Sequence, residues 1–156
     1  MASRTLGCAL GLALALFAPP ARAEFMCLSS KKANVREGAG MENPPLWVAS
    51  RFAPFKVLEW DGEWANVKDF EGDTGWVHMS VLSEVPCVVS IGKRANVREG
   101  PGVESELLWE VERGYRFRVL QRQGDWLEVT DGDEVEGWIF IKVVWGNKDP
   151  EEREES

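Results

Sequence analysis

"ANVREG" occupies residues 33–38, and the same six letters return at residues 95–100. A shift of 62 residues aligns 33–78 with 95–140 without a gap, and 20 of the 46 aligned positions are identical. Self-similarity of this kind indicates a duplicated structural unit. Each copy spans roughly 60 residues, which is the size of a small domain. The chain of 156 residues is therefore predicted to contain two sibling modules.

Each copy has the hydrophobic periodicity of β-strands. In the first copy, apolar and polar residues alternate at the start of 55–60, and apolar residues recur in 64–67. A glycine-centred turn at 61–63 separates the two segments, as in a hairpin, and a further strand is expected at 75–77. The equivalent segments of the second copy follow 62 residues later. With no helical period of useful length, the sequence predicts an all-β fold built from two small barrels or sandwiches.

The first 23 residues have the features of a secretory signal peptide. Arg4 precedes an apolar run from Leu6 to Ala18, and the small-x-small pattern of Ala21-Arg22-Ala23 follows that run. The run is shorter than the ~20 apolar residues that a membrane helix needs. We therefore expect residues 1–23 to be cleaved, the mature protein to be exported to the periplasm, and no stable membrane insertion after cleavage.

The charge of the remaining chain limits its partners. Of the 18 basic residues, Arg4 and Arg22 lie in the expected signal, so 16 basic and 26 acidic side chains remain, a net charge of −10. Affinity for nucleic acid comes largely from phosphates that meet Lys and Arg, so a nucleic-acid partner is not expected. The same charge disfavours binding to anionic membrane surfaces.

Several short motifs together resemble the bacterial SH3 domain (SH3b) family. They are "ANVREGAG" and "ANVREGPG", then "LW", then "GEW" or "GDW", then "GWVHMSVL" or "GWIFIKVV". The resemblance implies a five-stranded SH3-like barrel in each copy, so the expected fold is two such barrels in tandem. The expected boundaries are 24–84 for the first barrel and 85–146 for the second, after the signal at 1–23. Residues 147–156 form an acidic tail that is predicted to be disordered.

The resemblance also implies where a ligand groove lies. Arg36 and Arg98 precede the glycine-containing loop that flanks the groove in SH3-like barrels, so both are candidate ligand contacts. An arginine beside such a loop is also suited to bonding loop carbonyls or a local carboxylate, which is the structural alternative. Trp64 and Trp126 each begin a strand after a hairpin turn. In SH3-type domains a tryptophan at this position often lines the groove, and burial in the core is the alternative.

The two copies differ at positions that could affect binding. Trp60 aligns with Arg122, and the only histidine, His78, aligns with Phe140. Trp60 near Trp64 is expected to make the first groove the more aromatic one, and His78 is expected at the edge of the groove or in a structural role. These differences favour the hypothesis that the first barrel binds a ligand and the second is mainly structural.

Cys27 and Cys87 are a candidate disulfide. An even pair of cysteines in an exported chain is typical of disulfide bonding. In SH3-like barrels the first and last strands lie side by side. The resemblance therefore implies that Cys27, in the first strand of the first copy, lies close to Cys87, which follows the last strand of that copy.

The residue pattern favours binding over catalysis. The expected mature chain has no Cys/His pair free for nucleophilic work, no serine nucleophile elbow and no metal-ligand cluster, so neither an enzyme nor a cofactor is predicted. Two functions stay open at this point. One is a non-catalytic module that binds peptide or peptidoglycan stem peptide in the cell envelope. The other is a periplasmic adaptor or scaffold that binds an envelope protein through two barrels.

Overall fold

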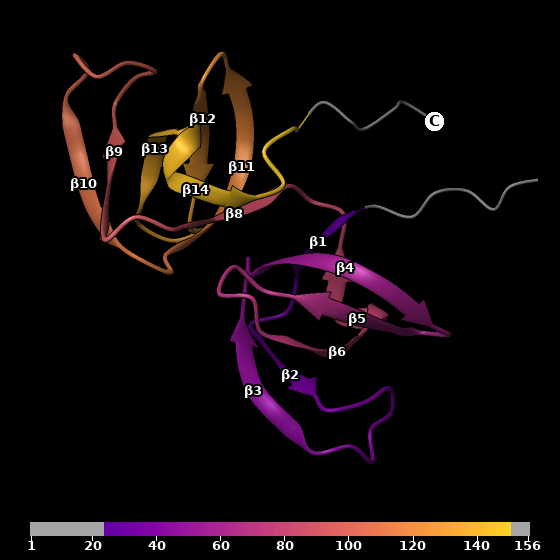
Figure 1. Ribbon diagram of the computed structural model, residues 1–156. Helices are drawn as coiled ribbons and strands as arrows, with labels where there is room; N and C mark the ends of the chain where they lie inside the picture. The colour runs from indigo at the N-terminus through magenta and orange to yellow at the C-terminus, as the bar shows by residue number, and fades with distance from the viewer. Residues whose placement is uncertain (1–23, 151–156) are drawn as a thin grey trace, which may run out of the picture.

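The computed structural model describes residues 24–150, and the expected signal peptide at 1–23 and the end of the acidic tail lie outside the described residues. These residues form two sheets of similar build (Figure 1). The elements of the first are β1 (Phe25–Leu28), β2 (Lys32–Arg36), β3 (Pro45–Ser50), β4 (Pro54–Asp61), β5 (Trp64–Lys68), β6 (Thr74–His78), the 3-10 helix η1 (Met79–Val81) and β7 (Leu82–Ser83). Those of the second are β8 (Cys87–Ser90), β9 (Arg94–Arg98), β10 (Leu107–Glu112), β11 (Arg116–Gln123), β12 (Trp126–Thr130), β13 (Glu136–Phe140), the 3-10 helix η2 (Ile141–Val143) and β14 (Val144–Gly146).

The two sheets repeat the same antiparallel topology. The strand order is β3-β2-β6-β5-β4-β1-β7 in the first and β10-β9-β13-β12-β11-β8-β14 in the second. The tight turns between β4 and β5 and between β11 and β12 contain Gly62 at φ 57° and Gly124 at φ 60°. Only glycine adopts this left-handed conformation without steric cost, which explains the glycines at the centres of both hairpins. The duplication seen in the sequence is therefore a duplication of the fold.

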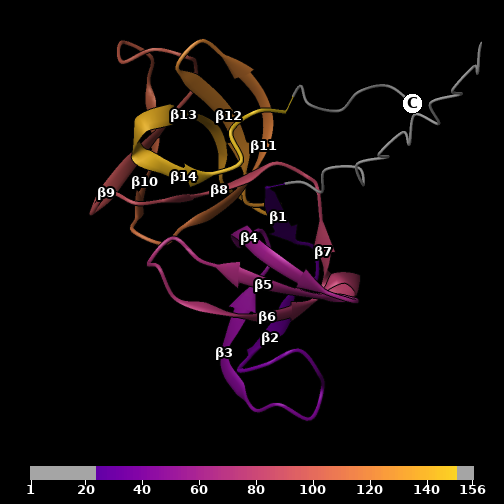
Figure 2. The ribbon, with the colours of Figure 1, turned by 45° about the vertical axis from the view of Figure 1, so that its right-hand side comes forward.

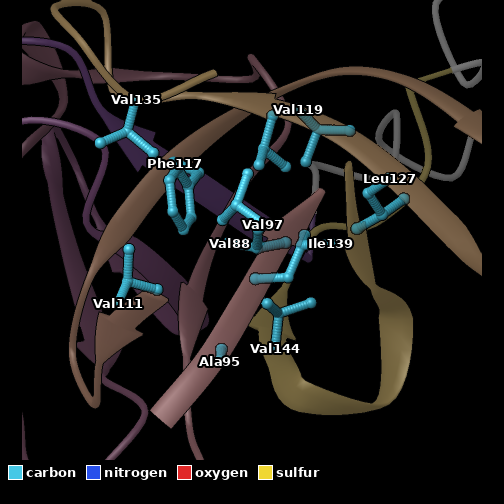
Figure 3. Close-up of a cluster of buried hydrophobic side chains, with 11 residues drawn as sticks. Val88, Ala95, Val97, Val111, Phe117, Val119, Leu127, Val135, Ile139 and Val144 are labelled. Carbon is cyan, nitrogen blue, oxygen red and sulfur yellow. The ribbon is translucent and has the colours of Figure 1, made fainter. Parts of the chain in front are cut away.

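Each sheet curls around its own apolar core. The first core consists of Leu28, Val35, Ala49, Phe55, Ala65, Val67, Val77 and Leu82. The second consists of Val88, Ala95, Val97, Val111, Phe117, Val119, Leu127, Val129, Val135, Ile139 and Val144. Figure 3 shows these second-barrel side chains pointing toward one another from strands that lie far apart in sequence. Because strand side chains alternate between the faces of a sheet, every second residue of strands such as β5 and β12 is buried in the core.

The all-β fold class and the two tandem barrels are confirmed, but each sheet has seven strands and not the five expected. The difference arises where the chain enters and leaves each barrel. The short strands β1 and β7 pair with each other, as Cys27 with Ser83 and Leu28 with Leu82. β8 and β14 pair in the same way in the second barrel. The hydrogen-bonding backbone of the connecting segments therefore extends each sheet beyond the five strands of the SH3-like pattern.

The predicted disulfide is present, with the Cα atoms of Cys27 and Cys87 5.9 Å apart. As expected, Cys87 follows the last strand of the first copy, and it does not lie within the first sheet. Cys27 lies in β1, but Cys87 begins β8, which pairs with β11 and β14 of the second sheet. β7 ends at Ser83, and the chain crosses to the second barrel before it reaches Cys87. The disulfide therefore links the two barrels to each other.

Other contacts accompany the disulfide at the junction of the barrels. The rings of Phe25 in β1 and Trp145 in β14 meet edge to face, with centroids 5.2 Å apart. Gly146 lies so close to Pro54 that an added Cβ would come within 2.9 Å of the proline ring. β1 and β8 lie at the junction in both views of the ribbon (Figures 1 and 2). The two barrels are thus joined by the disulfide and by packing contacts.

Candidate ligand groove

A groove of about 410 Å³ lies on the first barrel between the long β2–β3 loop and η1. Its lining comes from β2, the loop tip, the start of β5, the end of β6 and η1, and comprises Lys32, Ala33, Asn34, Arg36, Met41, Trp64, His78, Ser80 and Val81. Three residues predicted from the sequence, Arg36, Trp64 and His78, meet in this groove. The walls therefore combine an aromatic surface, a flexible thioether and several hydrogen-bonding groups, the mixture that small ligand sites use.

Trp64 and His78 form an aromatic pair across two neighbouring strands. They are direct partners in the β5–β6 ladder, and their ring centroids lie 5.1 Å apart with the planes at 76°. Their neighbours Ala65 and Val77 are buried, so Trp64 and His78 lie on the outer face of the sheet. An edge-to-face arrangement is a favourable geometry for two rings of this kind. The pair forms a fixed aromatic wall for the groove.

Hydrogen bonds set the orientation of the His78 ring. The backbone N–H of Ser80 donates to Nδ1 of His78 at 3.2 Å, and the Ser80 hydroxyl lies 2.7 Å from the same atom. Because Nδ1 accepts, the neutral ring carries its proton on Nε2. That nitrogen lies 3.6 Å from a carboxylate oxygen of Glu63. The imidazole is therefore held from both sides at the N-terminal end of η1.

Arg36 has the structural contact that was the alternative to ligand binding. Its Nη1 donates to the carbonyl oxygen of Asn43 at 2.7 Å, across the base of the long loop. The backbone N–H of Asn43 in turn donates to the carbonyl of Gly40 at 3.2 Å. These bonds shape the loop that carries Met41, whose side chain is 71% exposed at the edge of the groove. Arg36 thus both braces the loop and lines the groove.

The second barrel repeats the frame with a different aromatic pair. Trp126 and Phe140 are cross-strand partners with centroids 5.5 Å apart and planes at 50°. Arg98 donates to the carbonyl of Ser105 at 2.9 Å, as Arg36 does in the first loop. Phe140 makes no side-chain capping bond to η2, whereas His78 caps η1. The loop brace is therefore common to both barrels, and the polar imidazole is specific to the first.

Trp60 is not among the residues that line this groove. It is the partner of Ala65 in the β4–β5 ladder and packs against the first apolar core. A β-bulge between Val57 and Glu59 puts Trp60 on the core side of the sheet, whereas Trp64 lies on the outer side. At the equivalent position of the second barrel, Arg122 forms an ion pair with Asp149 and donates from Nε to the carbonyl of Gly124 at 3.0 Å. The two tryptophans of the first hairpin therefore face opposite sides.

The structure adds groove residues that the sequence analysis did not select. Met41 and Lys32 line the groove, and Ser80 both lines it and bonds His78. Ser80 could have been found, because a serine two residues after a histidine at a strand end can hydrogen-bond the ring locally. Met41 carries no such signal, since its part in the groove depends on how the long loop folds back. Across the described part of the chain, no group of three or more His, Cys, Asp or Glu side chains is arranged to hold a metal ion.

Two small curved barrels, each with a long braced loop and a 3-10 helix before the last strand, define the chain as a tandem SH3-like protein. Family models described as bacterial SH3 domain match residues 31–83 and 92–146. The chain belongs to the bacterial SH3 domain family, with one copy in each barrel. Among residues 24–150, no helix has the length and apolar character needed to cross a membrane.

Comparison with known proteins finds relatives that are longer than this chain, and one of similar size. YrvJ of Bacillus subtilis (strain 168), whose name assigns it as an N-acetylmuramoyl-L-alanine amidase, is 20% identical over 128 residues. The match covers 75% of this chain and 24% of YrvJ. The structure of NlpC2 from Trichomonas vaginalis matches with 13% identity and a TM-score of 0.35, over 78% of this chain and 47% of that one. The endolysin LysPBC5 CBD matches with 16% identity and a TM-score of 0.31, over 81% of this chain and 96% of that one.

Proposed function

We propose that this protein is a non-catalytic binding module of the cell envelope, and that the groove of the first barrel binds an extended peptide of the cell wall. The observation that carries the proposal is the Trp64–His78 pair, which lines a groove whose opposite side is the braced loop with Met41. An aromatic wall next to hydrogen-bonding groups suits a peptide backbone, because the ring covers the apolar side of the chain and the polar groups pair with its amides.

The family and the relative named as an amidase support a ligand in the cell wall. The amidase name refers to a bond in peptidoglycan, and YrvJ shares with this chain a region that covers 75% of it. We infer that this region binds the polymer in both proteins and that the present chain acts through binding alone. The proposed location is the periplasm, after cleavage of residues 1–23, and the proposed domain boundaries are 24–84 and 85–146, followed by the tail at 147–156.

The net charge limits which interactions can supply the affinity, and the two barrels are proposed to have different roles in binding. With a net charge of −10 after the expected cleavage, attraction to an anionic polymer cannot supply the affinity, so stacking and hydrogen bonds must. We propose that the first barrel carries the binding and that the second mainly supports it. The Nδ1 atom of His78 accepts a hydrogen bond from Ser80, and its Nε2 lies beside the Glu63 carboxylate, whereas Phe140 has no polar ring atom.

Sedimentation with purified peptidoglycan sacculi tests this function. The full mature protein is expected to co-sediment at moderate salt, the Trp64→Ala variant is expected to lose most of this binding, and the matched Trp126→Ala variant is expected to keep it. If the native protein stays in the supernatant under these conditions, the cell-wall function is wrong.

A second candidate function, an adaptor for an envelope protein, is favoured by the junction between the barrels. The Cys27–Cys87 bridge and the Phe25–Trp145 contact hold the barrels as neighbours, which suits a platform with two binding faces. Crosslinking in intact envelopes tests this alternative. Recovery of one protein partner in stoichiometric amount supports it, and crosslinks to peptidoglycan alone contradict it.

A further inference from the structure

The contacts between the two barrels are reciprocal under the 62-residue shift that relates the repeats. Phe70 of the first barrel lies against Gly114 of the second, where an added Cβ would be 3.6 Å from the phenyl ring. Phe52 of the first barrel lies against Gly132 of the second, where the corresponding distance is 3.2 Å. Phe52 aligns with Gly114, and Phe70 aligns with Gly132. The two aromatic–glycine contacts therefore exchange places under the repeat, as expected for an approximate two-fold arrangement.

An arginine-bearing turn of the second barrel belongs to this junction. The Arg113 guanidinium lies 5.2 Å from the centre of the Phe70 ring, and its Nε lies 3.8 Å from a carboxylate oxygen of Glu71. Beside this contact, the first barrel has a cavity of about 170 Å³ between β3 and the loop at 69–70. Val89 and Arg116 of the second barrel form its remaining wall. In the first barrel, this concavity is thus covered by an arginine-rich surface.

The second barrel has the equivalent concavity, and it is larger and open. Its volume is about 450 Å³, and all of its lining belongs to the second barrel. The positions that align with Val89 and Arg116 are Cys27 and Pro54. Cys27 is bonded to Cys87 and Pro54 is buried and short, so neither side chain reaches across. The approximate symmetry of the junction is broken at this point. Arg51 and Phe52 of the first barrel reach only an adjoining cavity, which shares Glu112, Tyr115, Asp131 and Asp133 with the concavity. No described residue of the first barrel lines the part of the concavity at Trp109 and Glu134.

The side chains around the second-barrel concavity are mostly acidic or aromatic. Its carboxylates are Glu110, Glu112, Asp131, Asp133 and Glu134, and the aligned positions of the first barrel are Val48, Ser50, Asp69, Glu71 and Gly72. The lining also includes Trp109, which is 37% exposed, and Tyr115. At the junction, the Arg113 guanidinium already lies beside an aromatic ring, that of Phe70, and a carboxylate, that of Glu71. Rings and carboxylates of this kind attract a cation.

We propose that the second-barrel concavity is a docking site for an arginine-bearing segment of a partner protein. The guanidinium would lie between the Trp109 ring and the carboxylates of Asp133 and Glu134, in the way that Arg113 lies between Phe70 and Glu71. β10 is an edge strand of its sheet, so an extended segment can also pair with its backbone. This face does not include the groove at Trp64, so the proposal is independent of the proposed cell-wall ligand.

The test is a titration of the full mature protein, labelled with ¹⁵N, by a capped peptide of sequence GRGRG. The expected result is saturable shifts of the Trp109 indole signal and of the backbone at 131–135, with the Trp64 indole signal unchanged. A capped GEGEG peptide of opposite charge is expected to produce no such shifts. The proposal is overturned if GRGRG shifts scattered surface signals without saturation, or if soluble muropeptides shift these same signals and GRGRG does not.

Two pairs of substitutions separate a local site from general charge attraction. The Asp133→Asn/Glu134→Gln variant is expected to raise the dissociation constant of GRGRG by about fivefold, because two exposed charge contacts are lost. The Glu104→Gln/Glu106→Gln variant removes the same charge from the neighbouring exposed loop and is expected to leave the constant unchanged. Equal weakening in both variants would mean that net charge alone attracts the peptide, and it would overturn the proposed site.

Discussion

The indole of Trp64 stands edge to face against the imidazole of His78, with ring centroids 5.1 Å apart, on the outer face of the first barrel. The equivalent pair of the second barrel, Trp126 and Phe140, has no polar ring atom in the second position. The two barrels share their frame and their loop brace but differ in the chemistry of this one pair. We therefore expect their grooves to differ in ligand binding, although the barrels share one fold.

The variant His78→Phe makes the first pair resemble the second and tests this difference. It removes the imidazole while keeping an aromatic ring, so it is expected to weaken binding of a soluble muropeptide by about five- to tenfold, the effect of about 1 kcal/mol of lost hydrogen bonding. Thermal unfolding is expected to change little, because the side chain is partly exposed. Isothermal titration calorimetry measures the affinity, with Phe140→His as the matched control. Unchanged affinity in His78→Phe would show that the imidazole has no part in binding.

The Cys27–Cys87 bridge is expected to stabilise the protein by reducing the conformational entropy of the unfolded chain. The bridge spans a sequence separation of 60 residues. In the chain-entropy model a loop of this length is worth about 4 kcal/mol, and measured values are often lower. The double variant Cys27→Ala/Cys87→Ala is therefore expected to have a lower free energy of unfolding in urea, with both barrels still folded by circular dichroism. Titration of the native mature protein with a thiol reagent checks the bridge itself, and two reactive thiols would contradict it.

Tyr115 is the only tyrosine of the chain and offers a direct pH test of the second-barrel concavity. Burial, and then the hydrogen bond that its hydroxyl donates to Asp131 at 2.7 Å, raise the pKa of Tyr115 to about 12. Because the folded pKa is above that of the unfolded chain, this contribution to stability is complete below about pH 10 and is lost as the pH rises toward 12. Absorbance at the tyrosinate band is expected to give a midpoint near the raised value in the native protein. Asp131→Asn is expected to lower it.

The carboxyl of Asp131 has the opposite dependence on pH. Burial by itself raises the pKa of Asp131, but the hydrogen bonds from the Tyr115 hydroxyl and from the N–H groups of Asp133 and Val135 outweigh burial and lower it. A carboxyl with a lowered folded pKa stabilises the fold above its unfolded pKa and loses this effect as acid protonates it. Urea unfolding near neutral pH and then below the ordinary carboxyl pKa is expected to show a smaller loss of stability on acidification for Asp131→Asn than for the native protein. Equal losses would contradict the role of Asp131.

Features that depend on residues close in the sequence could be predicted, and features that depend on pairing with another strand could not. The strands and hairpin turns follow from alternation and from glycines such as Gly62. The motif that contains Trp64 indicated a groove position for this residue, whereas for His78 the groove edge and a structural role both stayed open. Trp60 could not be placed, because the bulge between Val57 and Glu59 reverses the direction of every later side chain in β4. A bulge depends on pairing with the next strand and leaves no clear mark in the local pattern.

The contacts between the barrels could not be predicted from the sequence for a related reason. The cysteines could be paired, but the place of Cys87 depended on where the chain leaves the first sheet. That point is set by the backbone pairing of short connecting strands such as β7, which has only two residues. Arg116 and Pro54 are aligned positions of the two copies, and the effect of their difference could be recognised only by comparing the two cavities.

The central claim, that the first-barrel groove binds a cell-wall peptide, is tested most directly by the indole N–H signals of Trp64 and Trp126 during titration with a soluble muropeptide. The account predicts a saturable shift of the Trp64 signal together with the backbone signals of Met41 and Ser80, while the Trp126 signal stays in place. A saturable shift of the Trp126 signal alone would contradict it. A titration that shifts neither tryptophan signal, for a protein that does co-sediment with sacculi, would also contradict it.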